Sequence, residues 1–321
     1  MHRYISNAHK NGIFWISSKL FFPLILFKQS ALFLLSESDM RKTEIKHSIL
    51  VLATVLILGQ TLIGSTYAIK NGTLDRTAHP YVCWIVTWDG VSNYVYLGTG
   101  ALISSKVVLT AGHIAQPPIA VAWVSFEPIA DWPPWTNLPP SGSSSHWHEV
   151  ESWYTHPDYC IGCGSKGLTD WITHDVGILI LKDEISPPYA NLPFPGQVDT
   201  LSMKANLDLV GYGVQYQMRG IGVPPPDNWD WEVFGGRYTA KAQLIKGNYV
   251  MSDEFLRLTA NPGQGKGGTC YGDSGSPILL AGTNTILGVC SWGTNGNCAG
   301  VSYDQRIDTA DILDWINSFL P

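Results

Sequence analysis

Charged residues are scarce in this chain, at 14% of 321 residues, and Lys and Arg are outnumbered by Asp and Glu. No basic run occurs, so nucleic acid is not an expected partner. Helical periodicity is nearly absent, and there is no internal repeat or heptad pattern, which excludes bundles, solenoids and coiled coils. Gly, Trp and Tyr are plentiful instead, a composition that favours a β-rich fold with many turns.

Long uncharged hydrophobic runs are confined to the N-terminal part. From Met40 the chain has a basic opening, an apolar stretch from Ile49 to Gly64, and small residues ending at Ala68. This is the layout of a secretory signal peptide. An uncleaved membrane anchor is the alternative, although the stretch is slightly short for a membrane span.

We therefore expect residues 1–68 to be a leader, with 40–68 as the signal peptide. Residues 1–39 hold a second apolar region and are a possible start-site artefact or an anchor. The mature part, 69–321, has 13 Lys and Arg against 23 Asp and Glu. We expect it to be secreted or extracytoplasmic, monomeric, and without a stable membrane partner after cleavage.

Short apolar runs recur between turn signals in the mature part, as strands do. Only the C-terminal segment repeats its apolar residues at helical spacing, behind a possible N-cap at Asp308. An all-β body with one terminal helix is the predicted architecture. The strand-like runs are 81–86, 101–112, 176–181, 207–213, 277–280 and 285–293.

The stretch GTCYGDSGSPILL, from Gly268 to Leu280, holds a serine between Asp273 and Gly275. Gly and Asp are common in ordinary turns, so the stretch could be no more than a turn. The sharper interpretation is that Ser274 is a nucleophile on a tight turn, which aims backbone N–H groups at a reacting carbonyl oxygen.

A serine nucleophile needs a base and an acid that orients it. Among the histidines only His113 follows an apolar strand-like run and sits between small residues, in VVLTAGHIA. Asp175 opens the apolar run HDVGILIL and is the candidate acid. Asp170 and Asp183 are rivals by proximity, but neither immediately precedes the run.

Three segments together resemble the active-site segments of the chymotrypsin-like (trypsin family) serine proteases. They are TAGH around His113, DVGILIL from Asp175 and CYGDSGSP around Ser274, in that family's order. The resemblance spans nearly all of 69–321. It implies two packed antiparallel six-stranded β-barrels with a C-terminal helix. It also implies a serine endopeptidase that acts on proteins or peptides through a His-Asp-Ser triad, with no cofactor and no metal.

The resemblance assigns further roles. Backbone N–H groups of Gly272 and Ser274 would bind the oxyanion. Cleavage after Ala68 would free the amine of Ile69 to pair with Asp273, so that export itself would activate the enzyme. The segment THPDY, which contains His156, resembles a recurring structural segment, so this histidine is not expected to be catalytic.

The pocket for the substrate side chain is also implied by resemblance, with Gly268 at its floor. No carboxylate stands at that floor, which disfavours Lys and Arg, and the glycines leave room for a large apolar or aromatic side chain. The implied walls are Thr269, Ser291, Trp292, Gly293 and Gly300.

Six cysteines lie in the mature part, and export makes disulfides permissible. Cys270 and Cys298 match a family bridge beside the pocket. Cys160 and Cys163 could close a small loop or stay as thiols, since one Cys-x-x-Cys is weak evidence for zinc. Cys83 and Cys290 have no family assignment.

The chain departs from the family at a few positions. The disulfide beside the catalytic histidine is missing at both ends, where Gly98 and Ile114 stand, and Ser276 replaces a usual glycine. A catalytically inactive relative that serves as a binding module is the main alternative, although no triad residue is lost. A phosphate-binding loop at 261–268 is rejected because it lacks the Gly-Lys-Ser/Thr ending.

Overall fold

Strands make up most of the regular elements in the computed structural model of this chain. The described residues are 4–5, 68–92, 94–116, 118–130, 146–163, 172–186, 188–214, 217–219, 229–231, 235–245, 254–260, 266–294 and 298–321. Three predicted features lie outside the described residues: the leader up to residue 67 (apart from 4–5), the rival Asp170, and residues 261–265 of the rejected phosphate-binding loop. No helix among these residues is long and apolar enough to cross a membrane.

The first sheet closes into an antiparallel barrel. Its strands pair in the order β4, β3, β6, β7, β10 and β5, and β5 returns to β4. The two-residue strand β1 (Tyr4–Ile5) adds to the edge of β4. The barrel strands are β3 (Val82–Trp88), β4 (Tyr94–Leu102), β5 (Val107–Thr110), β6 (Val121–Ser125), β7 (His148–Thr155) and β10 (Gly177–Leu181).

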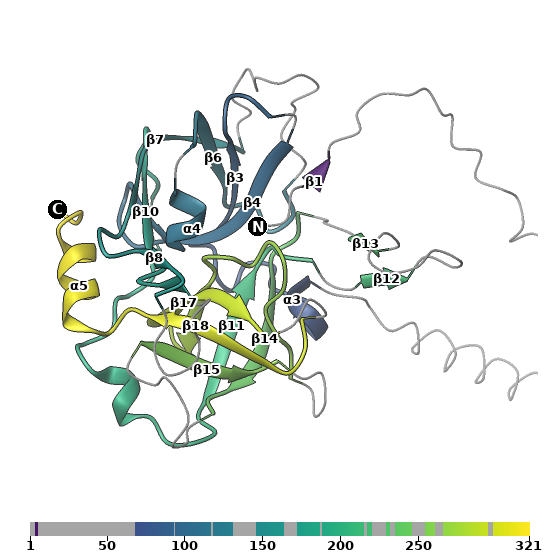
Figure 1. Cartoon of the computed structure of the whole chain (residues 1–321), viewed down its shortest axis with the longest axis vertical. Helices are drawn as coiled ribbons and strands as arrows, with labels where there is room; N and C mark the ends of the chain where they lie inside the picture. The colour runs from purple at the N-terminus through teal and green to yellow at the C-terminus, as the bar shows by residue number, and fades with distance from the viewer. Residues whose placement is uncertain are drawn as a thin grey trace, which may run out of the picture. The chain divides into compact units, whose positions relative to one another are not determined.

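The second sheet is a half-barrel that follows the first, and Figure 1 shows the two groups of strands side by side. Its strands pair in the order β15, β18, β17, β16, β11, β14 and β2. One bridge between Leu244 and Leu258 joins its far ends. The strands are β2 (Thr73–Leu74), β11 (Asn206–Gly211), β14 (Tyr238–Gln243), β15 (Phe255–Thr259), β16 (Pro277–Leu280), β17 (Ile286–Gly293) and β18 (Val301–Arg306).

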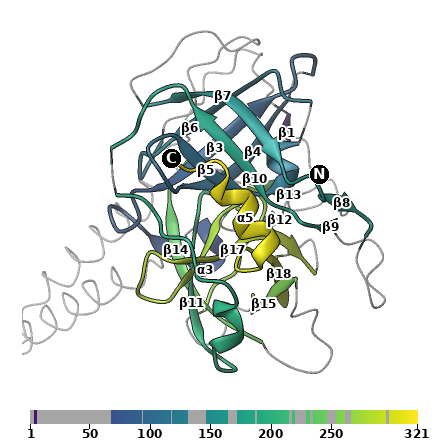
Figure 2. The same ribbon diagram turned by 90° about the vertical axis from the view of Figure 1, so that its left-hand side faces the viewer.

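The remaining elements are short, apart from the C-terminal helix. They are an irregular turn α3 (Ala68–Asn71), α4 (Gly112–Ala115), the pairs β8 (Cys160–Ile161) with β9 (Ile172–Thr173) and β12 (Gln217–Arg219) with β13 (Trp229–Trp231), a 3-10 turn (Gln197–Thr200), and α5 (Ala310–Asn317). Figure 2 shows α5 in front of the strands of both sheets.

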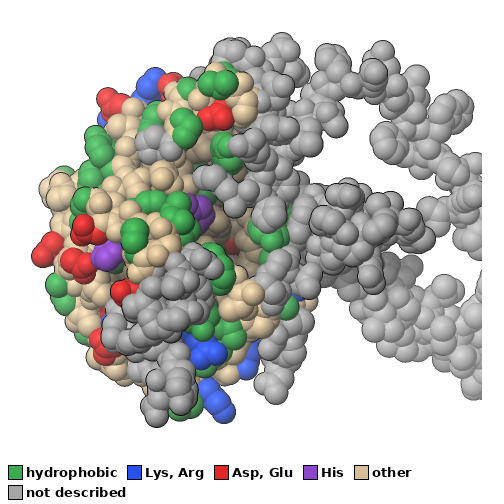
Figure 3. All heavy atoms as spheres, viewed as in Figure 1, with side chains coloured by type: hydrophobic (Ala, Val, Ile, Leu, Met, Phe, Trp, Pro, Cys, Tyr) green, Lys and Arg blue, Asp and Glu red, His purple; other side chains and the backbone are tan. Residues whose placement is uncertain are grey.

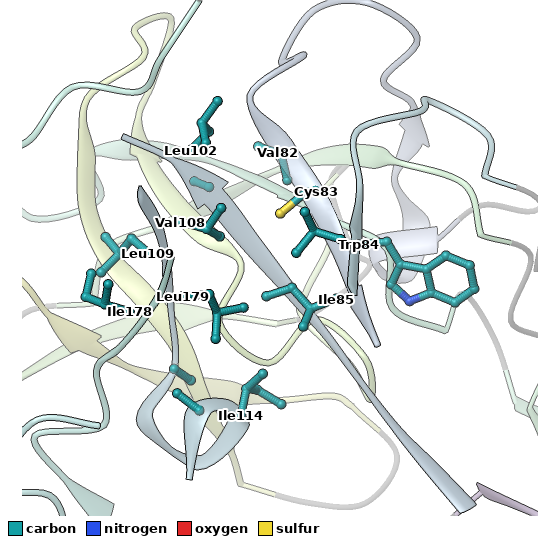
Figure 4. Close-up of a cluster of buried hydrophobic side chains, with 14 of the residues drawn as sticks. Val82, Cys83, Trp84, Ile85, Leu102, Val108, Leu109, Ile114, Ile178 and Leu179 are labelled. Carbon is teal, nitrogen blue, oxygen red and sulfur yellow. The ribbon is translucent and has the colours of Figure 1, made fainter. Parts of the chain in front are cut away.

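The barrel interior is filled by β-branched and other apolar side chains, which suit a pleated surface. Side chains from β3, β5, β10 and α4 converge there (Figure 4). Trp84, Ile85 and Leu179 are fully buried in this core. The helix α5 contributes Ile312 and Ile316 to the same cluster, so it is anchored on the first barrel.

The sequence predicted this architecture well, and the predicted strands match β3, the end of β4 with β5, β10, β11, β16 and β17 within a few residues. The predicted N-cap of the terminal helix was wrong, because Thr309 occupies that position. Asp308 is instead buried, where it accepts a hydrogen bond from the amide of Val198 and pairs with Arg306. The carboxylate of Asp308 therefore belongs to a buried ion pair and does not cap the helix.

Candidate active site

His113 and Asp175 meet because the strands next to them pair. The strand β5 runs antiparallel to β10, with Thr110 opposite Gly177. His113 lies three residues beyond Thr110 and Asp175 two residues before Gly177, so both stand at the same edge of the barrel. The rival Asp183 is exposed beyond the other end of β10.

Two hydrogen bonds join this pair. Nδ1 of His113 lies 2.8 Å from Oδ2 of Asp175, and the backbone N–H of His113 donates to Oδ1, also at 2.8 Å. The carboxylate is fully buried and the imidazole keeps 18% of its side chain exposed. An ionised carboxylate only accepts, so we assign the proton to Nδ1, which leaves Nε2 as an acceptor.

Ser291 is a further partner of Asp175 that the sequence did not reveal. Its hydroxyl donates to Oδ2 at 2.5 Å, and the amide of Asp175 donates to the side chain of Gln305 at 3.1 Å. Burial would raise the pKa of Asp175, but the charge that His113 carries when protonated and the bonds from His113 and Ser291 lower it. The pair therefore favours an ionised carboxylate beside the imidazole.

The turn that carries Ser274 is held against the first barrel by Thr99 of β4. The amide of Thr99 donates to the carbonyl oxygen of Ser274 at 2.8 Å, and its hydroxyl donates to the carbonyl oxygen of Gly272 at 2.9 Å. The hydroxyl of Thr110 in turn donates to the carbonyl oxygen of Thr99 at 2.8 Å. One threonine thus fixes the serine turn to the strands that lead to His113.

Glycine is required on both sides of the serine. Gly272 has φ of +90° and Gly275 has φ of +82°, in the left-handed region. A Cβ on Gly275 would overlap the hydroxyl of Thr110 and would lie 2.6 Å from the amide nitrogen of Ala111. The residue after Ser274 therefore touches the chain two residues before His113.

Asp273 lies buried beneath the serine turn. It accepts hydrogen bonds from the amides of Cys270 at 2.9 Å and Gly213 at 2.8 Å. Burial raises the pKa of Asp273 to about 7, against the lowering effect of these two bonds. Ile69 is fully buried nearby, since its Cδ1 and Oδ1 of Asp273 both approach Gly211.

The residues of the predicted pocket lie around the same turn. Gly268 forms a bridge with Lys70, whose carbonyl oxygen accepts its amide at 3.1 Å. A disulfide joins Cys270 to Cys298, with their Cα atoms 5.1 Å apart. Ser291, Trp292 and Gly293 form the end of β17, Thr269 precedes Cys270, and Gly300 accepts a backbone hydrogen bond from Ala260.

The structure also shows the other cysteines and the positions where the chain lacks the family's disulfide beside His113. Cys160 and Cys163 form a disulfide, whereas Cys83 and Cys290 are buried thiols. A Cβ on Gly98 would lie 2.9 Å from Cδ1 of Ile114, so the isoleucine packs closely against the glycine at the two positions without a disulfide.

Ser276 is fully buried, and its amide donates to the carbonyl oxygen of Asp273 at 2.8 Å. His156 is buried against Trp315 and stacks on His174. The side chain of His156 therefore packs between the end of β7 and α5. Among the described residues there is no group of three or more His, Cys, Asp or Glu that could hold a metal ion.

The family model described as Trypsin matches residues 72–316. The chain belongs to the trypsin family. Comparison with curated protein sequences gives no significant match. The three segments around His113, Asp175 and Ser274 fall within the matched range, whereas Ile69 lies just before it.

Solved structures support the fold. HL collagenase is 17% identical over 78% of this chain and 97% of its own, with a TM-score of 0.56. Human heparin binding protein is 17% identical over 78% of this chain and 96% of its own, with a TM-score of 0.52. The VesB protease of Vibrio cholerae is 16% identical over 78% of this chain and 67% of its own, with a TM-score of 0.52. At such low identity the likeness is one of fold alone.

Proposed function

We propose that this trypsin-family chain is a serine endopeptidase in which Ser274, His113 and Asp175 form a catalytic triad. The observation that carries the proposal is the doubly hydrogen-bonded, buried pair of Asp175 and His113, beside a turn that Thr99 ties to the same barrel. Protein or peptide substrates follow from the family.

In the proposed reaction, Nε2 of His113 takes the proton of the Ser274 hydroxyl while Oγ attacks the scissile carbonyl carbon. The imidazolium then gives that proton to the leaving amine, which leaves an ester on Ser274. Water is deprotonated by the same imidazole and attacks the ester, releasing the acid and restoring the serine. Asp175 stays ionised and stabilises the imidazolium, as its lowered pKa favours.

The backbone N–H groups of Gly272 and Ser274 would hold the oxyanion of each tetrahedral intermediate. The positive φ of Gly272 supports this role, because it turns the peptide in a way that other residues rarely adopt. The hydroxyl of Thr99 keeps the carbonyl of Gly272 fixed, so the turn is organised before substrate binds.

A fluorophosphonate that modifies active serines tests this proposal. We expect stoichiometric labelling at Ser274, and loss of labelling by at least about 10³-fold in His113→Ala because the hydroxyl then lacks its base. The matched control is His146→Ala, since that imidazole is 61% exposed and its pair with Glu127 lies at the surface. Mass spectrometry of the tryptic peptide locates the label.

The alternative is a catalytically inactive binding module. Human heparin binding protein, named for a ligand and not for a reaction, has the same fold. This chain has a net charge of −6, which gives no long-range attraction to a polyanion. Unlabelled Ser274 in correctly folded protein would favour the binding module.

We also propose that export activates the enzyme, with cleavage after Ala68 and secretion of a monomer of 69–321. In the uncut chain Ile69 already lies against Gly211 beside Asp273, and Lys70 already pairs with Gly268. A freed ammonium at Ile69 would therefore belong to a residue that already packs beside the buried carboxylate.

This activation makes a prediction about stability and pH. In the uncut chain the pKa of Asp273 is raised to about 7, so the folded state binds a proton that the unfolded chain releases near pH 4. The free energy of unfolding should fall as pH rises from 4 to 7, by up to about 1.4 kcal/mol per pH unit from this group. Urea unfolding of uncut chain, made without export, measures the slope.

Asp273→Asn should reduce that slope in the uncut chain, and cleaved protein with an ammonium at Ile69 should lack the contribution of Asp273. An equal slope in uncut and cleaved protein would contradict the pairing. A mature N-terminus mapped well upstream of Ile69 in fully active protein would also count against activation by export.

The side chain preferred before the scissile bond remains a sequence-based prediction. Large apolar or aromatic residues are expected from the glycines at 268, 293 and 300, and from the absence of a carboxylate at Gly268. A carboxylate that reaches the pocket from another strand would reverse that preference.

A further inference from the structure

Asp304 is a fully buried carboxylate on β18 that the proposed triad does not use. It alternates along the strand with Tyr303, whose ring faces Arg257 at 5.6 Å, so the charged arginine and Asp304 lie on opposite faces. Its own face also carries Ser302, which is 2% exposed. Burying a carboxylate without a cation is costly, and the position therefore needs a reason.

Only neutral groups satisfy this carboxylate in the described part of the chain. The hydroxyl of Ser302 donates to Oδ2 at 2.9 Å, while Oδ1 has no hydrogen-bond partner. The backbone of Ser291 and the thiol of Cys290 interact with the carboxyl group and lower its pKa, but burial outweighs them and raises it to about 7. None of the ion pairs found among the described residues includes Asp304.

The same contacts place Asp304 against the predicted substrate pocket. Ser291 is one of the predicted walls, and Cys290 interacts with both Asp304 and Thr269, a second wall. The strand β18 pairs with the end of β17, with Ser302 opposite Gly293. Asp304 therefore lies behind two of the predicted pocket walls, Ser291 and Thr269, on the strand that pairs with the end of β17.

We propose that Asp304 determines specificity by binding the cationic side chain of Lys or Arg before the scissile bond. The proposal rests on the endopeptidase function above, and it replaces the expected preference for large apolar side chains. An ammonium or guanidinium would supply the donors that Oδ1 lacks and the positive charge that the buried carboxylate lacks. An apolar side chain would supply neither.

The proposal also gives the preference a pH dependence. The titratable groups that the described part of the chain places near Asp304 are acids, Asp273 and the thiol of Cys290, so no described cation keeps it ionised before substrate binds. The ratio of kcat/KM for an Arg peptide to that for its citrulline analogue should rise between pH 6 and 8. The ratio cancels the pH dependence of the catalytic steps that both peptides share.

Matched peptides that differ only before the scissile bond (Arg, Lys, citrulline, Phe) test the proposal with secreted, processed protein. We expect Arg and Lys to exceed citrulline by at least about tenfold in kcat/KM, since a charged bond in a buried site is being compared with a neutral one. Asp304→Asn should bring kcat/KM for the Arg and Lys peptides down to that for citrulline. The control is Asp183→Asn, whose carboxylate is exposed.

Binding of benzamidine, measured by calorimetry, separates this proposal from the proposed function because it needs no turnover. If fluorophosphonate fails to label Ser274, the endopeptidase proposal falls, and benzamidine binding that Asp304→Asn weakens at least tenfold would still support Asp304. If Ser274 is labelled but wild type prefers Phe, or Asp304→Asn leaves the profile and benzamidine affinity unchanged, the Asp304 proposal is overturned. Asp304→Glu provides a charged variant if the asparagine variant folds poorly.

Discussion

Asp175→Asn is expected to lower kcat by about 10⁴-fold with little change in KM, the loss that follows when a triad carboxylate becomes an amide. The backbone N–H of His113 now donates to Oδ1. The amide oxygen of asparagine will keep that bond, so its NH₂ group must face Nδ1. The imidazole then carries its proton on Nε2 and cannot accept one from Ser274.

Steady-state kinetics on a peptide that the wild type cleaves would measure this loss. Asp183→Asn is the matched control, because it makes the same change on an exposed loop and should stay within about twofold. Ser291→Ala should have an intermediate effect, since it removes one donor to Asp175 and leaves both bonds of His113. More than a tenth of the wild-type kcat in Asp175→Asn would contradict the assigned role.

The fold and the candidate site were predictable from sequence to the extent that their signals are local. The turn around Ser274 and the run after Asp175 each carry their own pattern of small and apolar residues. Strand pairing then brings His113 and Asp175 to one edge, a geometry that resemblance implied and the β5–β10 register explains.

What sequence reasoning missed depends on contacts between distant residues. Asp304 lies 36 positions after Gly268, and the pairing of β18 with β17 places it behind the predicted pocket walls. Thr99 likewise has no motif that marks it as the residue that fixes the serine turn. Asp308 looked like a helix cap because the pattern gave no sign of its buried partner, Arg306.

The largest expected loss of stability comes from another such contact, the buried pair of Arg237 and Asp75. Nε of Arg237 donates to Oδ2 of Asp75 at 2.9 Å, and both side chains are at most 1% exposed. The same guanidinium donates to three carbonyl oxygens, those of Arg76 at 2.7 Å, Phe126 at 2.9 Å and Val82 at 3.0 Å. It thus joins the segment after Ile69 to the first barrel.

Arg237→Ala should lower the free energy of unfolding by about 3–5 kcal/mol at pH 7, because it removes the cation beside the buried Asp75 carboxylate, which keeps its bonds from His79, and takes a donor from three carbonyl groups. Arg237→Lys should recover only part of the loss, since one ammonium cannot reach partners on several sides. Lys241→Ala is the control. Its ammonium pairs with Asp208 but is 65% exposed, so removal should cost less than about 1 kcal/mol.

The pH dependence of the free energy of unfolding gives a second readout of the pair of Arg237 and Asp75. Burial would raise the pKa of Asp75, but bonds and charge from His79 and Arg237 lower it below its ordinary value. Its contribution is therefore present above the unfolded pKa near 4 and disappears as pH falls through the lower folded value. Urea unfolding at pH 7 and pH 3 should show a large difference between wild type and Arg237→Ala at pH 7 and a smaller one at pH 3. An equal difference at both would mean that lost packing, and not the ion pair, explains the effect.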